Sequence, residues 1–333
     1  MVIYDSYGAQ LSLGQEIARG SESILYAVNW PRGTVAKLFY SPTEEQFQKL
    51  TWMLKHPPLD PGQATGRISF TWPSTLLFNK VGRFVGYLMP ALPRMLSLMK
   101  MLQEFYDPSF QERMERTGQL WDVLHRIARH LAGIVDAIHK KGYIIGDLHM
   151  QNIFVSLDGG VTLIDTDSVQ VKEFRIAQVI VYPAPPGKVE YMPPEFQFGL
   201  PRELEHDYFG LGVLIFTLLL LHHPFRSQWL GAGSPPPLRE RIRRGWFPYS
   251  LTAPGLVDVP KDAPGLHILH PTVADLIRRC FVQGHKPPLL RPSPSEWARA
   301  LAEAELVLVQ CRQHHYFIPG YQSCPWCRAA RKW

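Results

Sequence analysis

The 333-residue chain has 46% hydrophobic and 19% charged residues, the profile of an ordinary globular protein with two modest domains or one bilobal domain. Its formal net charge of +6 is compatible with a nucleotide, an acidic partner or nucleic acid, and it selects none of them. The first residues lack the basic start and apolar run of a signal peptide, and the four cysteines do not have the pattern of a disulfide framework. We therefore expect a cytoplasmic protein.

The first 90 residues predict a small β-rich unit with one helix. Residues 11–40 alternate in the manner of strands with a turn between them. Residues 42–56 predict a helix, because a proline and two acidic residues begin the segment. Residues 68–78 and 83–90 predict further strands.

Helices dominate after Pro90. Apolar residues at steps of three and four predict a long amphipathic helix over 120–138. Two short strands, 153–157 and 161–165, are expected to follow it. The most apolar stretch, 209–221, is shorter than the roughly 20 residues that a membrane span requires, so we expect a buried core helix and no membrane partner.

Three oxygen-bearing side chains stand at the ends of these predicted elements. Asp147 and Asn152 lie in YIIGDLHMQNIFV, between the long helix and the strand pair, and Asp165 ends the second strand. Carboxylate and amide oxygens suit a hard cation that holds nucleotide phosphates. The alternative is that these residues only cap a turn.

Two segments closer to the N-terminus are compatible with phosphate binding. Lys37 lies in VAKLFY, on a strand whose neighbouring residues are apolar. The segment IARGSESILYAV, which contains Gly20 and Ser21, resembles a degraded glycine-rich loop with Ala18 and Ser23 at the other glycine places.

Taken in order, these motifs resemble those of the protein kinase superfamily. VAKL is similar to the strand-three lysine motif, IGDLHMQN to the catalytic loop and IDTD to the metal-binding DFG motif. GKVEYMPPE looks like the end of an activation segment, and DYFGLGVLIFTLLL looks like the central helix of the large lobe with Asp207 as its anchoring acid. RPSPSEW contains Arg291, which the resemblance pairs with Glu195.

The resemblance covers most of the chain and implies a bilobal α+β fold. We expect a β-rich N-lobe over 1–90, a helical C-lobe over 91–305 and a small zinc-binding tail over 306–333. The closing RAARKW does not look like a designed end, so continuation of the native chain past Trp333 stays open.

The resemblance implies a role for each matching residue. Asp147 would orient or deprotonate an acceptor hydroxyl, and Lys37 would bind the α- and β-phosphates of ATP. Asn152 and Asp165 would hold Mg²⁺, or Mn²⁺ in its place.

Further contacts to ATP follow from the same likeness. Gly20 and Ser21 would cover the phosphates, and backbone groups near Met89 to Leu92 would meet the adenine edge. A helix glutamate should pair with Lys37; Glu44 and Glu45 are the two candidates, and we choose Glu45.

Several positions depart from the family pattern. Gly146 replaces the arginine that normally reads an activation-loop phosphate, and residues 169–194 contain no serine or threonine. We therefore predict an enzyme that is not switched by Ser/Thr phosphorylation in that segment. His149 replaces a lysine that usually touches the γ-phosphate, and Lys188 is the hypothetical substitute for it. Asp167, in the last place of the DFG motif, is interpreted as a turn acid rather than a further metal contact.

The C-terminal tail, CRQHHYFIPGYQSCPWC, has the spacing of a structural zinc site. One predicted ligand pair is Cys311 with His314, and the second is Cys324 with Cys327. Four such ligands suit tetrahedral Zn²⁺ with no open coordination position. His315 stays open as the alternative ligand, and a redox-active CxxC is the competing interpretation. A kinase-like domain with a CPWC tail resembles bacterial kinases encoded beside a phosphatase and a von Willebrand A-type protein.

We thus expect an ATP- and Mg²⁺-dependent protein kinase, directed at Ser or Thr of a protein substrate in a bacterial signalling or stress system. Two other classes stay open: a pseudokinase scaffold that binds nucleotide, and a small-molecule phosphotransferase of the aminoglycoside or choline type. Nucleic-acid binding has only the mild basic excess behind it and is not expected.

Overall fold

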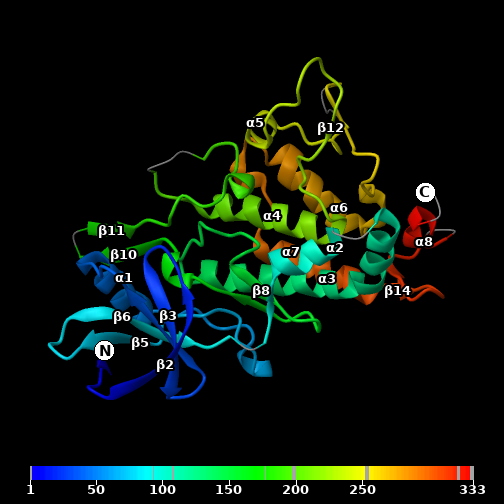
Figure 1. The fold of residues 1–333 in the computed structure, drawn as a ribbon. Coiled ribbons are helices and arrows are strands. Elements are labelled where there is room, and N and C mark those ends of the chain that lie inside the picture. The colour runs from blue at the N-terminus through cyan, green and yellow to red at the C-terminus, as the bar shows by residue number, and fades with distance from the viewer. Residues whose placement is uncertain are drawn as a thin grey trace.

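The computed structural model describes residues 2–92, 94–106, 109–176, 178–196, 200–251, 255–320 and 323–330 (Figure 1). Its N-terminal part is a closed antiparallel barrel with the strand order β1-β2-β3-β4-β6-β5. The strands are β1 (Ile3–Asp5), β2 (Gln10–Arg19), β3 (Ser23–Trp30), β4 (Thr34–Phe39), β5 (Thr75–Asn79) and β6 (Phe84–Pro90).

One helix, α1 (Glu44–Lys55), packs against this barrel. Thr43 begins it through a capping box with Gln46, and the helix buries Leu50 and Met53. The strand expected over 68–78 is shorter than predicted.

Its first residues leave the barrel. The amide of Thr71 donates to the carbonyl of Leu163 and the amide of Leu163 donates to the carbonyl of Ser69, so this segment bridges to β9 (Val161–Leu163) instead of joining the barrel sheet.

The helical part is built around two long elements. α3 (Phe110–Lys140) begins well before the predicted start, because Ser109 forms a capping box with Glu112. α4 (Leu204–Leu220) is the predicted core helix, and every residue from Phe209 to Leu220 is buried. The other helices are α2 (Leu98–Tyr106), α5 (Leu238–Arg244), α6 (Pro271–Arg278), α7 (Pro294–Leu306) and α8 (Pro325–Ala330).

Four small sheets in the described ranges complete the helical part. The loop that carries Asp147 is followed by the sheet β7-β8-β9, formed by Leu96–Ser97, Ile153–Val155 and Val161–Leu163. The remaining pairs are β10 (Val171–Arg175) with β11 (Gln178–Tyr182), β12 (Gln228–Trp229) with β13 (Val257–Asp258), and β14 (Val309–Gln310) with β15 (Tyr316–Phe317).

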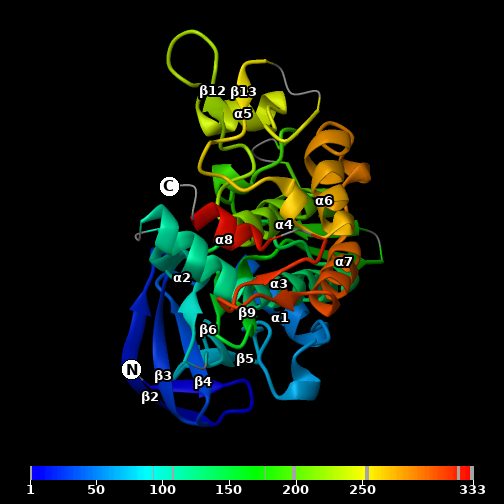
Figure 2. The same ribbon diagram turned by 90° about the vertical axis from the view of Figure 1, so that its right-hand side faces the viewer.

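The C-terminal tail lies on the helical part, where α8 packs beside α3 (Figure 2). Within the described ranges, no helix combines the length and the apolar character that crossing a membrane would require.

Candidate functional site

A cleft of about 750 Å³ lies between the barrel and the helical part. It collects residues from the β2–β3 turn, β4, α1 and the loops at 147 and 165–168. Six of the predicted site residues line it: Gly20, Ser21, Lys37, Glu45, Asp147 and Asp165. Four other predicted site residues in the described part of the chain lie outside this lining: Met89, Leu92, Asn152 and Lys188. The adenine contact near Met89 to Leu92 therefore stays a prediction.

Lys37 lies at the inner wall of the cleft, on β4 between buried neighbours. Its Nζ is 2.8 Å from Oδ1 of Asp167 and 3.2 Å from Oδ1 of Asp165. Burial by itself would lower the pKa of Lys37, but the charges of Asp167 and Asp165 raise it above its ordinary value. Lys37 is therefore a fixed ammonium group that faces the cleft.

The partner of Lys37 differs from the predicted one. Within the described part of the chain, no ion pair joins Lys37 to Glu45 or Glu44; both acids stand in the first turn of α1, and Glu44 accepts from Gln48. Both oxygens of Asp167 accept from Lys37 instead, at 2.8 and 2.9 Å. Asp167 does lie in a short turn, Thr166–Ser168, as interpreted, but the partner of its side chain is Lys37, which the sequence did not indicate.

The loop around Asp147 is held from below by Asp207, the first-turn acid of α4. Its carboxylate accepts the backbone N–H of Ile145 at 2.7 Å and that of Gly146 at 2.9 Å, and it lies 2.8 Å from Nε2 of His139. Asn152 closes the loop by donating from Nδ2 to the carbonyl of Asp147 at 3.2 Å. The loop is thus positioned by buried hydrogen bonds before any ligand arrives.

His149 contacts the carboxylate of Asp147 directly. Nδ1 of His149 accepts the backbone N–H of Gln151 at 3.1 Å, so the neutral ring carries its proton on Nε2. Nε2 lies 3.4 Å from Oδ1 of Asp147. His149 can therefore orient this carboxylate, a role that the sequence pattern did not indicate.

Lys188 reaches the same loop from the segment before α4. Its ammonium donates to Oε1 of Gln151, next to the Asp147 loop. The preceding Gly187 has φ of 72° and passes so close that a Cβ there would lie 2.8 Å from the carbonyl oxygen of Gly146 and 3.4 Å from Oδ1 of Asp147. Lys188 is thus adjacent to the loop, which keeps the hypothesis that it touches the γ-phosphate.

Arg202 is a functional candidate that the sequence reasoning missed. Its side chain covers Gly146: a Cβ on that glycine, whose φ is 72°, would lie 3.0 Å from Cδ of Arg202. The guanidinium donates to the carbonyls of Pro185, at 2.7 Å, and Pro186. The sequence contains one indication, the glycine at 146 in place of an arginine. It shows that the usual cation is absent from the loop, but it does not identify Arg202 as the residue that takes its place.

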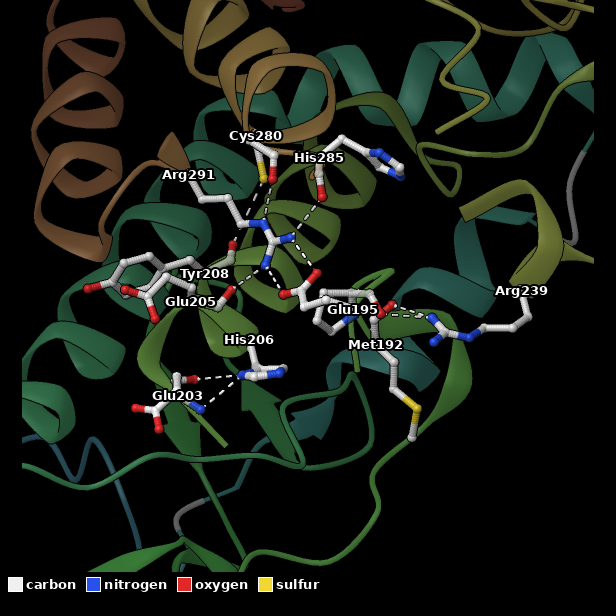
Figure 3. Close-up of polar contacts among 12 residues, drawn as sticks. Met192, Glu195, Glu203, Glu205, His206, Tyr208, Arg239, Cys280, His285 and Arg291 are labelled. Atoms are coloured by element: carbon white, nitrogen blue, oxygen red, sulfur yellow. Dashed lines mark hydrogen bonds and ion pairs between the residues drawn. The ribbon is translucent and has the colours of Figure 1, made fainter. Parts of the chain in front are cut away.

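Arg291 fixes the far end of the segment that leads to α4 (Figure 3). Its guanidinium makes a bidentate contact with Glu195, at 2.6 and 2.7 Å, which confirms the predicted pair. The same group donates to the carbonyls of Gly284, Glu205 and His285.

A second cluster of ligand-type residues lies in the tail. The ligand atoms of Cys311, His315, Cys324 and Cys327 all lie within 4.8 Å of one another. Sγ of Cys311 and Sγ of Cys327 are 3.8 Å apart, about the edge of a tetrahedron with Zn–S bonds of about 2.3 Å. Burial raises the pKa of Cys327 to about 12, so a cation would have to draw out its thiolate.

The histidine of this cluster is His315, and the choice of His314 is corrected. His314 takes φ of 61° at the turn between β14 and β15 and is exposed. His315 is buried, and its Nδ1 lies 3.2 Å from Sγ of Cys327. The turn after Cys311 therefore sends the second of the two adjacent imidazoles inward.

Comparison with known proteins gives the family. A model described as "Protein kinase domain" matches residues 92–297. The chain belongs to the protein kinase family. Protein kinase YegI of Escherichia coli O157:H7 is 28% identical over 339 residues, 98% of this chain and 50% of that protein. Eukaryotic translation initiation factor 2-alpha kinase 3 of Rattus norvegicus is 29% identical over 181 residues, covering 50% of this chain and 16% of the relative.

The kinase fold is also found among solved structures. The ROP18 kinase domain, solved in complex with AMP-PNP and sucrose, aligns with a TM-score of 0.55 and 16% identity, covering 92% of this chain and 83% of that one. The bilobal α+β fold is confirmed. The chain spans about half the length of the YegI proteins that it matches.

Proposed function

We propose that the chain is an ATP-dependent protein kinase that transfers a phosphoryl group to Ser or Thr of a protein. The observation that carries the proposal is the meeting of Lys37, Asp147 and Asp165 at one cleft, in a chain of the protein kinase family. Phosphoryl transfer needs little covalent chemistry from the protein; it needs positioned charges, which these three residues provide.

The residues of the cleft fit ATP and a divalent cation. Asp165 is half-exposed to the cleft and offers a carboxylate, and Asn152 is anchored beside Asp147, so these two would hold Mg²⁺ or Mn²⁺. The bound metal would neutralise charge that develops on the phosphates. Lys37 would bind the phosphates as a fixed ammonium group. Gly20 and Ser21, at the tight β2–β3 turn, would lie over them.

Asp147 would orient the acceptor hydroxyl and accept its proton. His149 contacts one oxygen of this carboxylate, and among the described residues the other oxygen has no hydrogen bond, so it could face a substrate. Lys188 would approach the γ-phosphate from the segment opposite. Protein substrates are proposed over small molecules because the Arg291–Glu195 contact builds the platform below this segment that small-molecule phosphotransferases lack.

The decisive experiment is transfer of label from ATP in the presence of Mg²⁺, with and without candidate protein acceptors. We expect labelling by the wild-type chain and its loss in Asp147→Ala, with nucleotide binding retained. Asp122→Ala, which removes an acid of the α3 surface, is the matched control and should keep the activity. Nucleotide binding without any transfer would replace this proposal by the alternative of a nucleotide-binding scaffold.

In the tail we propose a structural Zn²⁺ bound by Cys311, His315, Cys324 and Cys327. We also propose that the chain divides into an N-lobe at 1–90, a C-lobe at 91–305 and a tail at 306–333. A phosphatase and a von Willebrand A-type protein are proposed as partners in a bacterial stress system, on the likeness of the CPWC tail. A cytoplasmic location is proposed because ATP and reduced cysteines both belong to that compartment.

A further inference from the structure

The ion pair at the back of the cleft has its acid on an unusual element. Lys37 is held by Asp167, from the loop after β9, whereas kinases typically pair this lysine with a glutamate of the helix that corresponds to α1. The side chains of Lys37 and Asp167 are each 12% exposed, so the pair is largely withdrawn from water. Helix α1 therefore does not need to supply the acid that pairs with Lys37.

The helix presents a lysine to the cleft as well as Glu45, which lines it but, within the described ranges, forms no ion pair with Lys37. Lys49 lies one turn after Glu45 on α1, next to the buried Leu50, and it lines the cleft together with Lys37 and Asp167. Among the described residues, the side chain of Lys49 makes no hydrogen bond and no ion pair. Its pKa is lowered to about 8 by burial, against the opposing charges of Asp167 and Glu45.

This environment argues for a missing anionic ligand. Lys49 lines the cleft beside Lys37 and Asp167, where the phosphates of a nucleotide would lie. A half-buried ammonium group without a partner is costly, and two lysines at one wall repel each other. A triphosphate that enters the cleft would satisfy the ammonium of Lys49 and relieve its repulsion with Lys37.

We propose that Lys49 is a second phosphate-binding lysine of this cleft, which contacts the nucleotide phosphates beside Lys37. The inference deepens the proposed function and rests on it, because it requires ATP in the cleft. It names a contact from a helix that normally contributes an acid at this place.

The test compares the affinities of ATP, ADP and adenosine by titration calorimetry in Mg²⁺ buffer. Lys49→Met removes the charge and keeps the length of the side chain, and Lys49→Arg keeps the charge. Lys55→Met is the matched control, because Lys55 is an exposed lysine on the same helix that does not line the cleft.

We expect Lys49→Met to weaken ATP and ADP by about tenfold or more, as the loss of a charge-assisted contact does, and to leave adenosine unchanged. Lys49→Arg should retain most of the affinity, and Lys55→Met all of it. Equal weakening of adenosine and ATP would mean a distorted cleft and would overturn the inference, as would wild-type ATP affinity in Lys49→Met. A wild-type chain that binds no ATP would refute the proposed function first.

Discussion

Arg202 supplies from outside the loop a cation that the loop itself lacks. With Gly146 before Asp147, the sequence has no arginine at the family position, and the Arg202 side chain fills the space above that glycine. Burial lowers the pKa of Arg202, while Asp207 and Asp147 oppose that shift, so the guanidinium stays charged between the loop and the Pro185–Pro186 carbonyls. The guanidinium therefore ties the Pro185 and Pro186 carbonyls to the loop that carries Gly146.

From this contact we predict that Arg202→Met loses phosphoryl transfer by about tenfold or more, because a hydrogen bond from a charged group is worth roughly 1.5–3 kcal/mol. Turnover at saturating ATP is the measurement, with the thermal midpoint to check folding. Arg175→Met is the control: among the described residues Arg175 forms its ion pair with Glu173, on the exposed hairpin, so this variant should retain activity. Full activity that depended on a phosphate in residues 169–194, seen by intact mass, would contradict this account.

At the scale of elements, the tail is joined to the large lobe through a close approach to α3. A Cβ at Gly118 would lie 2.7 Å from Cγ of Trp326 and 2.9 Å from the ring of His315, so only glycine fits there. Trp326 packs edge-on against Trp121, with ring centroids 5.3 Å apart, and Trp121 donates to the carbonyl of Leu219 on α4. The segment that carries the Cys–His cluster therefore packs directly against α3, in the core of the large lobe.

We predict that the purified chain carries one zinc ion, and that Cys324→Ser loses it and unfolds at a lower temperature. The physical reason is that metal binding ties β14, β15 and α8 together and so contributes directly to folding. Zinc content by elemental analysis and the thermal midpoint are measured together. Cys280→Ser is matched, because Cys280 is buried against α4 outside the cluster and its loss should leave the zinc content intact. Chelation without any thermal effect would mean that the cluster holds no structural metal.

Elements with strong local signals were predictable, and those made by distant pairing were not. The apolar periodicity of α3 and the apolar run of α4 predict both helices. The capping box at Ser109 explains why α3 starts earlier than predicted. The short β1 closes the barrel by pairing with β2 and β5, and three residues carry no such signal. The hairpin β10–β11 was likewise missed.

The candidate site follows the same rule. Motif order placed Lys37, Asp147 and Asp165 at one cleft, because each sits at a fixed point of its element. Glu45 lines the cleft, so the partner of Lys37 depended on where the loop after β9 places Asp167. The choice between His314 and His315 depended on a single left-handed residue in a turn. Spacing along the chain contains neither piece of information.

At the scale of the whole molecule, Arg291 joins two segments that are far apart in sequence, 195–205 and 284–291. Its side chain is fully buried and contacts Glu195 at the end of the activation segment, the carbonyl of Glu205 at the start of α4, and the carbonyls of Gly284 and His285 (Figure 3). Arg291 is fully buried whereas Glu195 is 30% exposed, so removal of Arg291 leaves this carboxylate partly uncompensated and the three carbonyls without their buried donor.

Arg291→Met should therefore lower the free energy of unfolding by about 3–5 kcal/mol, measured by urea denaturation. Arg226→Met is the comparison: Arg226 pairs with Asp262, but the two side chains are 47% and 36% exposed, so its loss should cost about 0–1 kcal/mol. Because Arg291 meets the activation segment and the helical core at once, we expect a single lowered transition rather than a separate early unfolding of the segment. Equal losses in the two variants would show that burial of the Arg291 contact adds nothing to its effect on stability.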